Sequence, residues 1–182
     1  MSYVIAFVAG LFLWTFLEYA IHNWLGHLPK GRHHLSREHL AHHKQTDYFT
    51  PGVRKVIAAT PVLSLTALAV WPLAGLGVGV TLAAGLGAGW MAYEVLHRRI
   101  HTHAPTNAYG RWARRHHLHH HFSRPFKNHG VTTPIWDLLL GTYEQPSVIK
   151  VPRRHAGSLP WLASPANPAQ VAAPFAEEYR IV

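Results

Sequence analysis

The sequence predicts an all-α, polytopic membrane protein with about three to four membrane helices and a cytoplasmic, histidine-rich helical cap. Three observations predict this class: long apolar segments, a one-sided distribution of Lys and Arg, and 17 histidines gathered in a few motifs. Hydrophobic residues make up 48% of the 182 residues and charged residues only 14%, below the roughly 25% usual for soluble domains. The sequence contains no cysteine, so neither a disulfide nor a thiolate metal site is available.

Three segments are apolar enough to cross a membrane, because about 20 residues rising ~1.5 Å each span the ~30 Å hydrocarbon layer. They cover residues 3–22, 56–73 and 75–96, and the only acidic residue in the first and in the third is a glutamate near its end. The first segment lacks the basic region and cleavage site of a signal peptide, so we expect it to remain as a span. A turn at residues 72–75 is expected to join the other two as a hairpin.

The basic residues predict the orientation. All 17 Lys and Arg lie in residues 30–55 and 98–180, and none precedes residue 30. Because Lys and Arg favour the cytoplasmic side, we expect the N-terminus outside, and the 23–53 loop and everything after residue 96 in the cytoplasm. The net charge of +9 then suits an anionic inner leaflet rather than nucleic acid. The compact chain and its Ala, Gly and Arg usage suggest a bacterial inner membrane.

Two domains are expected, a membrane domain over residues 1–145 and a C-terminal tail over residues 146–182. After the last span the chain is polar and basic until residues 131–143, VTTPIWDLLLGTY, an amphipathic segment expected at the membrane surface. From Pro146 onward the sequence is rich in Pro and Ala, which predicts an irregular tail with one helical turn near its end.

Ten histidines form four motifs whose spacing predicts a metal site. These are His22-x4-His27, His39-x2-His42-His43, His97-x3-His101 and His117-x2-His120-His121. Residues three and four apart share a helix face, so each of the last three motifs presents its imidazoles to one side. His22 and His27 are five apart, so the helix is expected to end between them, which Gly26 and Pro29 favour. Ten imidazoles are too many for one ion and about right for two, so we expect a dinuclear site.

Two other interpretations of the crowded histidines are a solvated surface run and a metal-storage tract. Four spaced groups on one membrane face favour a catalytic metal site instead. Spacing alone leaves the last motif open by one residue, because His116-x2-His119-His120 fits equally well. The histidines without partners at ligand spacing are expected at the surface: His33, His34, His103, His129 and His155.

Nitrogen ligands suit Fe, Zn, Cu or Ni and disfavour Mg or Ca. Glu18 and Glu94 lie one turn before His22 and His97, where each carboxylate is able to accept the distal imidazole N–H and orient the ring. A plain charge at the lipid interface is the alternative for both. Only Glu94 and His97 have the Glu-x-x-His spacing of carboxylate-rich di-iron bundles, so we expect a histidine site and no catalytic side chain beyond the metal ligands.

Four stretches, residues 14–27, 39–51, 93–101 and 116–143, resemble the fatty acid hydroxylase/sterol desaturase superfamily of membrane di-iron oxygenases. The resemblance is closest to the fatty acid 2-hydroxylase branch. It implies a membrane-bound, O2-dependent monooxygenase that hydroxylates a lipid or fatty acyl chain from the bilayer. Two iron ions held by the ten histidines are implied as cofactors, with zinc an alternative in a purified sample.

The resemblance also implies a register for the last motif. Phe122, residues 130–132 (Gly-Val-Thr) and residues 136–137 (Trp-Asp) match the residues that succeed the last histidine motif in the family. The implied ligands are therefore His117, His120 and His121, with His116 and His119 as supporting neighbours.

The resemblance is incomplete in two respects. Asn23 stands where the family usually has Arg, and we expect no haem-binding electron-transfer domain fused to these segments. A separate ferredoxin- or cytochrome-like electron donor is therefore expected, and no nucleic-acid partner. A desaturase or a sterol or carotenoid hydroxylase on the same scaffold, and a non-enzymatic membrane metal-binding protein, are the alternatives.

Overall fold

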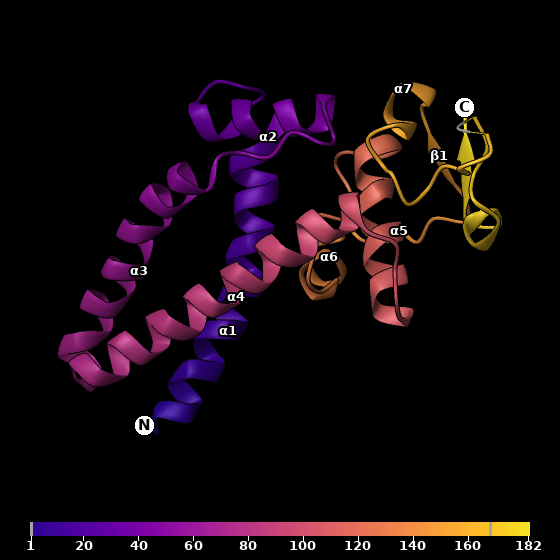
Figure 1. Cartoon of the computed structure of the whole chain (residues 1–182). Helices are drawn as coiled ribbons and strands as arrows, with labels where there is room; N and C mark the ends of the chain where they lie inside the picture. Colours follow the sequence, from indigo (N-terminus) through magenta and orange to yellow (C-terminus); the bar gives the residue numbers. More distant parts are fainter. Residues whose placement is uncertain (1, 168) are drawn as a thin grey trace. The chain divides into compact units, whose positions relative to one another are not determined.

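The computed structural model describes residues 2–167 and 169–182. The chain is mostly helical and divides into two compact units. The first unit contains the residues up to Glu18 and Thr50–Glu94, and the second contains Tyr19–Phe49 and Val95–Val182. Figure 1 shows the elements in chain order.

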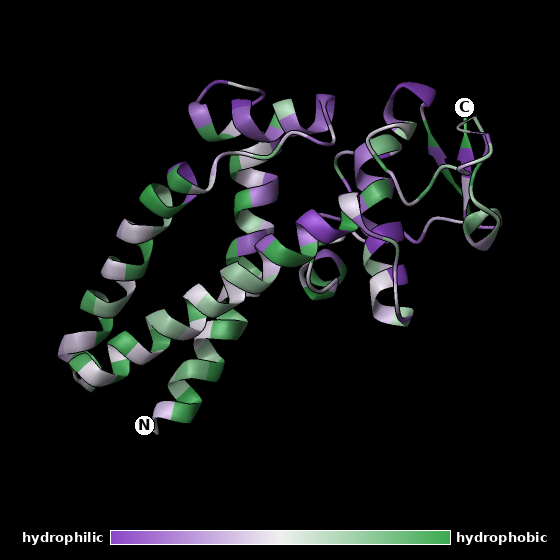
Figure 2. Cartoon of the chain, in the orientation of Figure 1, coloured by the Kyte–Doolittle hydropathy of each residue, from purple (hydrophilic) through white to green (hydrophobic). Residues whose placement is uncertain are grey.

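Three helices of the described chain are long and apolar enough to cross a membrane. The first is α1 (Tyr3–Ala20), which continues directly into a π-helix, η1 (Ile21–His27); the others are α3 (Gly52–Ala74) and α4 (Leu76–Thr102). No residue of α3 is buried, as expected for a helix surrounded by lipid. Apolar residues predominate along α1, α3 and the first part of α4 (Figure 2). The polytopic, helical class predicted from sequence is confirmed.

Glycines allow close helix contacts within the first unit. A Cβ atom on Gly85 of α4 would overlap the carbonyl of Phe7 in α1, and one on Gly79 would overlap the carbonyl of Ala67 in α3. Both neighbouring helices therefore approach α4 at a glycine, as small residues permit in membrane proteins. Gly75 alone separates α3 from α4 and has a φ of 89°, a left-handed conformation that favours glycine. The expected hairpin is present.

Helices also build the histidine-bearing part of the second unit. These are η1, α2 (His34–Lys44), the last two turns of α4, α5 (Ala108–Phe122) and the short α6 (Ile135–Leu139), with α2 packed against η1. Asn107 caps α5 by accepting a hydrogen bond from the Gly110 N–H at 2.7 Å. The buried Arg114 guanidinium donates to the carbonyl oxygens of Arg99 and His103, both at 2.8 Å. It thereby ties α5 to the C-terminal end of α4.

The C-terminal segment is more ordered than the irregular tail predicted from sequence. It contains β1 (Ile149–Val151), α7 (Arg153–Ala156), a 3-10 turn η2 (Ala173–Phe175) and β2 (Tyr179–Ile181). The two strands pair in parallel, with Ile149 opposite Tyr179, and β1 packs against α5. Apolar side chains cause the difference, since Leu159 and Leu162 are fully buried. A domain boundary at residue 145 stays a prediction.

Candidate metal centre

The structure collects all ten histidines of the four motifs into two groups of five. The first group contains His22, His27, His39, His43 and His120, and the second contains His42, His97, His101, His117 and His121. Within each group the five nearest ring nitrogens lie within 4.8 Å of one another. Histidines that share one helix face would be expected to join the same group. The motifs on α2 and α5 instead each divide their histidines between both groups.

The nitrogen atoms of the first group converge closely. The Nε2 atom of His120 lies 2.9 Å from that of His22, 3.0 Å from that of His27 and 3.1 Å from that of His43. The Nε2 atom of His39 lies 2.8 Å from that of His27. A neutral imidazole nitrogen has a single N–H or a single lone pair, so hydrogen bonds alone do not account for three neighbours around one atom.

Backbone carbonyls determine which nitrogens carry the protons in two of these rings. The Nδ1–H of His22 donates to the carbonyl of His129 at 2.5 Å, and the Nδ1–H of His120 donates to the carbonyl of Lys127 at 2.7 Å. In their neutral forms both rings therefore point a bare Nε2 lone pair at the other. Two facing lone pairs repel each other, whereas a cation between them is bound by both.

The spacing in this group fits the coordination sphere of a transition metal. Metal–imidazole bonds are about 2.0–2.1 Å long, so two ligands at a right angle are separated by about 3 Å. The observed Nε2 separations of 2.8–3.1 Å have this value. All donors are imidazoles, which suit Fe, Zn, Cu or Ni.

The second group is built in the same way. The Nε2 atoms of His101 and His117 lie 3.1 Å apart. His42 donates its Nδ1–H to the carbonyl of Tyr48 at 2.7 Å and so presents Nε2 to the group. Both ring nitrogens of His121 are buried and have no hydrogen-bond partner among the described residues. A buried polar atom without a partner is costly, and a bound metal ion would remove that cost.

The π-helix η1 explains how His22 and His27 join one group. The prediction that the helix ends between them is wrong: the helix widens instead, and the Leu28 N–H donates to the Asn23 carbonyl five residues earlier at 3.0 Å. This repeat places side chains five residues apart on the same face. Gly26 is needed at the same place, because a Cβ atom there would lie 2.9 Å from Cδ2 of His39.

Burial keeps the ligand candidates neutral. Burial first, and the neighbouring imidazoles second, hold the pKa of five histidines well below the usual 6.5: His39, His43, His117, His120 and His121. Only a neutral imidazole binds a metal ion, so the rings are in the required form at pH 7.

The structure distinguishes the two registers of the last motif by position. His117, His120 and His121 belong to the two groups, whereas His116 and His119 do not. The Nε2–H of His116 donates to Asp137 at 3.2 Å, and that of His119 to Glu144 at 3.0 Å.

The two glutamates expected to orient ligands belong to the first unit. Glu94 forms an ion pair with Lys55 and accepts a hydrogen bond from Trp90 Nε1 at 3.2 Å. Glu18 is buried, with 2% of its surface exposed. A role for either carboxylate in orienting a histidine stays a prediction.

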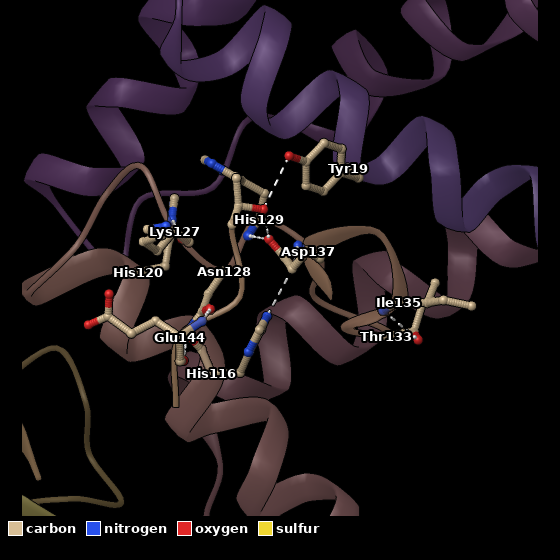
Figure 3. Close-up of polar contacts among 12 residues, drawn as sticks. Tyr19, His116, His120, Lys127, Asn128, His129, Thr133, Ile135, Asp137 and Glu144 are labelled. Atoms are coloured by element: carbon tan, nitrogen blue, oxygen red, sulfur yellow. Dashed lines mark hydrogen bonds and ion pairs between the residues drawn. The ribbon is translucent and has the colours of Figure 1, made fainter. Parts of the chain in front are cut away.

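Asp137 is a buried part of the site that motif spacing did not single out. Its carboxylate accepts hydrogen bonds from the backbone N–H groups of His129 and Gly130, both at 2.8 Å, from Thr142 Oγ1 at 2.7 Å and from His116 (Figure 3). Burial raises the pKa of Asp137, but the four hydrogen bonds outweigh burial and lower it, so the group is ionised. Asp137 therefore fixes the backbone at His129 and Gly130, and the carbonyl of His129 accepts the hydrogen bond from the Nδ1–H of His22.

Two of the five histidines expected at the surface are buried. His129 is fully buried, with its ring centroid 5.2 Å from that of His120, and His155 is 6% exposed and packs against Phe122. Sequence spacing missed His129 because the loop after α5, rather than a helix face, brings it to the site. His33, His34 and His103 are exposed, as expected.

These features define a mostly helical, multi-pass membrane protein with histidine clusters suited to metal ions. The chain belongs to the fatty acid hydroxylase family, whose model matches residues 7–142. The family resemblance inferred from the motifs is thereby confirmed.

Named relatives agree with this family. The dihydroceramide fatty acyl 2-hydroxylase FAH1 of Arabidopsis thaliana is 28% identical over 158 residues, which cover 81% of this chain and 62% of the relative. The human fatty acid 2-hydroxylase is 29% identical over 143 residues, covering 75% of this chain and 38% of the relative.

A solved structure described as full-length scs7p, with only the hydroxylase domain visible, superposes with a TM-score of 0.64 at 26% identity. It matches 81% of this chain and 60% of the solved chain. This chain thus spans less than two thirds of the length of these relatives.

Proposed function

We propose that the protein is a membrane-bound, O2-dependent hydroxylase that acts on a fatty acyl chain of a lipid and uses two iron ions. One observation carries the proposal: in a chain of the fatty acid hydroxylase family, ten imidazoles, seven of them buried, converge in two groups of five. The names of the relatives favour hydroxylation at carbon 2 of the acyl chain.

Each group would hold one iron ion through its five histidines. Bound iron would supply the activation of O2 that hydroxylation of an unreactive C–H bond requires, a chemistry that no side chain provides. Zinc would occupy the same ligands in a sample purified without iron.

The protein would contribute orientation and a dry site. Backbone carbonyls of His129, Lys127 and Tyr48 hold the Nδ1–H groups of three rings, which fixes the ring planes and directs each Nε2 inward. His117, His120 and His101 are at most 1% exposed, which excludes bulk water from their rings. These contacts determine where the metal ions would sit relative to an acyl chain.

The lipid would enter from the bilayer, and the electrons would come from a separate carrier. The distribution of Lys and Arg favours an external N-terminus and cytoplasmic histidine motifs. The Ala, Gly and Arg usage favours a bacterial inner membrane as the location. A separate ferredoxin- or cytochrome-like protein would then reach the site from the cytoplasm. Residues 1–145 would form the hydroxylase domain and residues 146–182 a C-terminal segment.

A comparison of membrane lipids tests the proposal. The chain and its His120→Ala variant are expressed in a host whose lipids carry no hydroxylated acyl chains, and the lipids are analysed by mass spectrometry under ¹⁸O2. The expected result is one labelled oxygen atom in an acyl chain, in cells with the unaltered chain only. Loss of two hydrogens without added oxygen would indicate a desaturase, and a labelled sterol or carotenoid would change the substrate class. Unchanged lipids in cells containing the metal-loaded protein would contradict all three.

A further inference from the structure

Aromatic rings form a stacked column along one face of α5. The ring centroids of Tyr109 and Trp112 lie 5.6 Å apart and those of Trp112 and His116 lie 5.0 Å apart, with planes within 29° of parallel. Tyr143 stacks against His116 at 5.7 Å. The column runs from the protein surface to the interior, because Tyr109 is 50% exposed and His116 only 2%.

Hydrogen bonds continue from the buried end of this column to the first histidine group. His116 donates to Asp137 at 3.2 Å, and Asp137 accepts from the backbone N–H of His129 at 2.8 Å. The carbonyl of His129 then accepts the Nδ1–H of His22 at 2.5 Å. Figure 3 shows His116, Asp137 and His129 in this order. An uninterrupted series of contacts therefore joins an exposed tyrosine to a ligand candidate.

A cavity lies beside the column. Its volume is about 210 Å3, and its lining includes Trp112, Tyr143, two arginines (Arg111 and Arg115) and two glutamates (Glu144 and Glu178). Glu178 forms ion pairs with Arg111 at 3.4 Å and with Arg115 at 3.8 Å. Trp, Tyr and Arg are the residue types that dominate the binding energy of protein interfaces. The cavity lining itself is balanced in charge. Residues 103–182 as a whole contain nine Lys and Arg against four Asp and Glu, a net positive charge that favours an acidic partner.

We propose that this cavity is the docking site of an acidic one-electron carrier protein, and that the column from Tyr109 through Trp112 to His116 conducts its electrons to the first histidine group. This inference rests on the proposed function. Hydroxylation of one C–H bond by O2 consumes two electrons and two protons and releases one water. Two carrier molecules would each be oxidised by one electron, which passes to the metal ions. The aromatic residues would return to their starting redox state.

Binding of the carrier provides the first test, and it does not depend on turnover. The full chain in lipid nanodiscs is titrated with an acidic [2Fe–2S] ferredoxin and with a soluble b-type cytochrome domain. Arg111→Gln is expected to weaken binding of one of them about fivefold at low salt. The matched control is Arg153→Gln, an exposed arginine on α7 that does not line the cavity. Failure of both carriers to bind, or equal losses in the two variants, would overturn the docking site.

Reduction of the iron-loaded protein provides the second test. In stopped-flow measurements at saturating carrier, Trp112→Leu is expected to slow reduction several-fold, whereas Trp112→Phe keeps a ring and retains most of the rate. Dithionite, a small reductant that needs no docking site, should reduce both variants as fast as the unaltered protein. Unchanged reduction of Trp112→Leu by the carrier would overturn the column.

The outcomes separate this inference from the proposed function. Normal, Trp112-dependent reduction without any hydroxylated lipid would leave the column intact and contradict the hydroxylase. Hydroxylated lipid formed equally fast by Trp112→Leu would support the hydroxylase and contradict the column.

Discussion

His22 and His129 are joined by a hydrogen bond of 2.5 Å from an imidazole Nδ1–H to a backbone carbonyl. Since a carbonyl only accepts, the bond leaves the Nε2 lone pair of His22 free to face His120. Asp137 maintains this arrangement by binding the N–H groups of His129 and Gly130. The carboxylate touches no ligand candidate directly, yet it orients one.

Replacing Asp137 with alanine tests this role. The change leaves buried donors on His129, Gly130 and Thr142 without their acceptor, at about 1–3 kcal/mol for each. We expect a clearly lower unfolding midpoint and fewer bound metal ions per chain, measured by thermal denaturation and atomic absorption. Glu177→Gln, at an exposed carboxylate, should change neither. Full metal content in Asp137→Ala would contradict the orienting role.

The histidine groups themselves predict which imidazoles are needed for metal binding. His120→Ala removes the nitrogen nearest to three others in the first group, and His121→Ala removes a ring of the second. Both variants are expected to lose metal and turnover. His34→Ala is the control, since that side chain is 62% exposed and belongs to neither group. Equal metal content in all three variants would rule out the assignment.

Gly26→Ala is expected to disturb the site without altering any ligand candidate. The new methyl group would lie 2.9 Å from Cδ2 of His39, so the ring or the π-helix must move. We expect reduced metal affinity, measured by competition with a chelator. Gly157→Ala is the matched control, because it has open space and a helical φ of −67°. That substitution should be neutral or stabilise by up to about 1 kcal/mol.

Sequence patterns were sufficient for the spans, the hairpin and the first three histidine motifs, because these depend on local hydropathy and on residue spacing. The register of the last motif needed the family resemblance, because spacing alone left it open by one residue. They were insufficient where a loop carries the residue. Asp137 and His129 belong to the segment after α5, and the path of that segment through space cannot be predicted from sequence periodicity. The π-helix was also missed, since a spacing of five suggests a helix end when only α-helical repeats are considered.

The metal-free protein should become less stable as the pH falls. As the pH falls below about 6.5, the unfolded chain takes up protons on its histidines, while the buried ones, His39, His43 and His120 among them, remain neutral because their pKa values are lowered. The free energy of unfolding should therefore decrease between about pH 6.5 and about pH 5 and change little above about pH 7. Unfolding midpoints of chelator-treated protein measure this. A midpoint that rises on acidification would contradict the neutral state of the buried rings.

The helices α2 and α5 each place histidines in both groups: His42 is separated from His39 and His43, and His120 from His117 and His121. Neither helix can rotate to suit one group without moving ligands of the other. Under the proposed function, the first ion to bind would already order most of the ligands of the second. Loading is then expected to be cooperative, so that chains carrying a single ion are rarer than independent binding would produce.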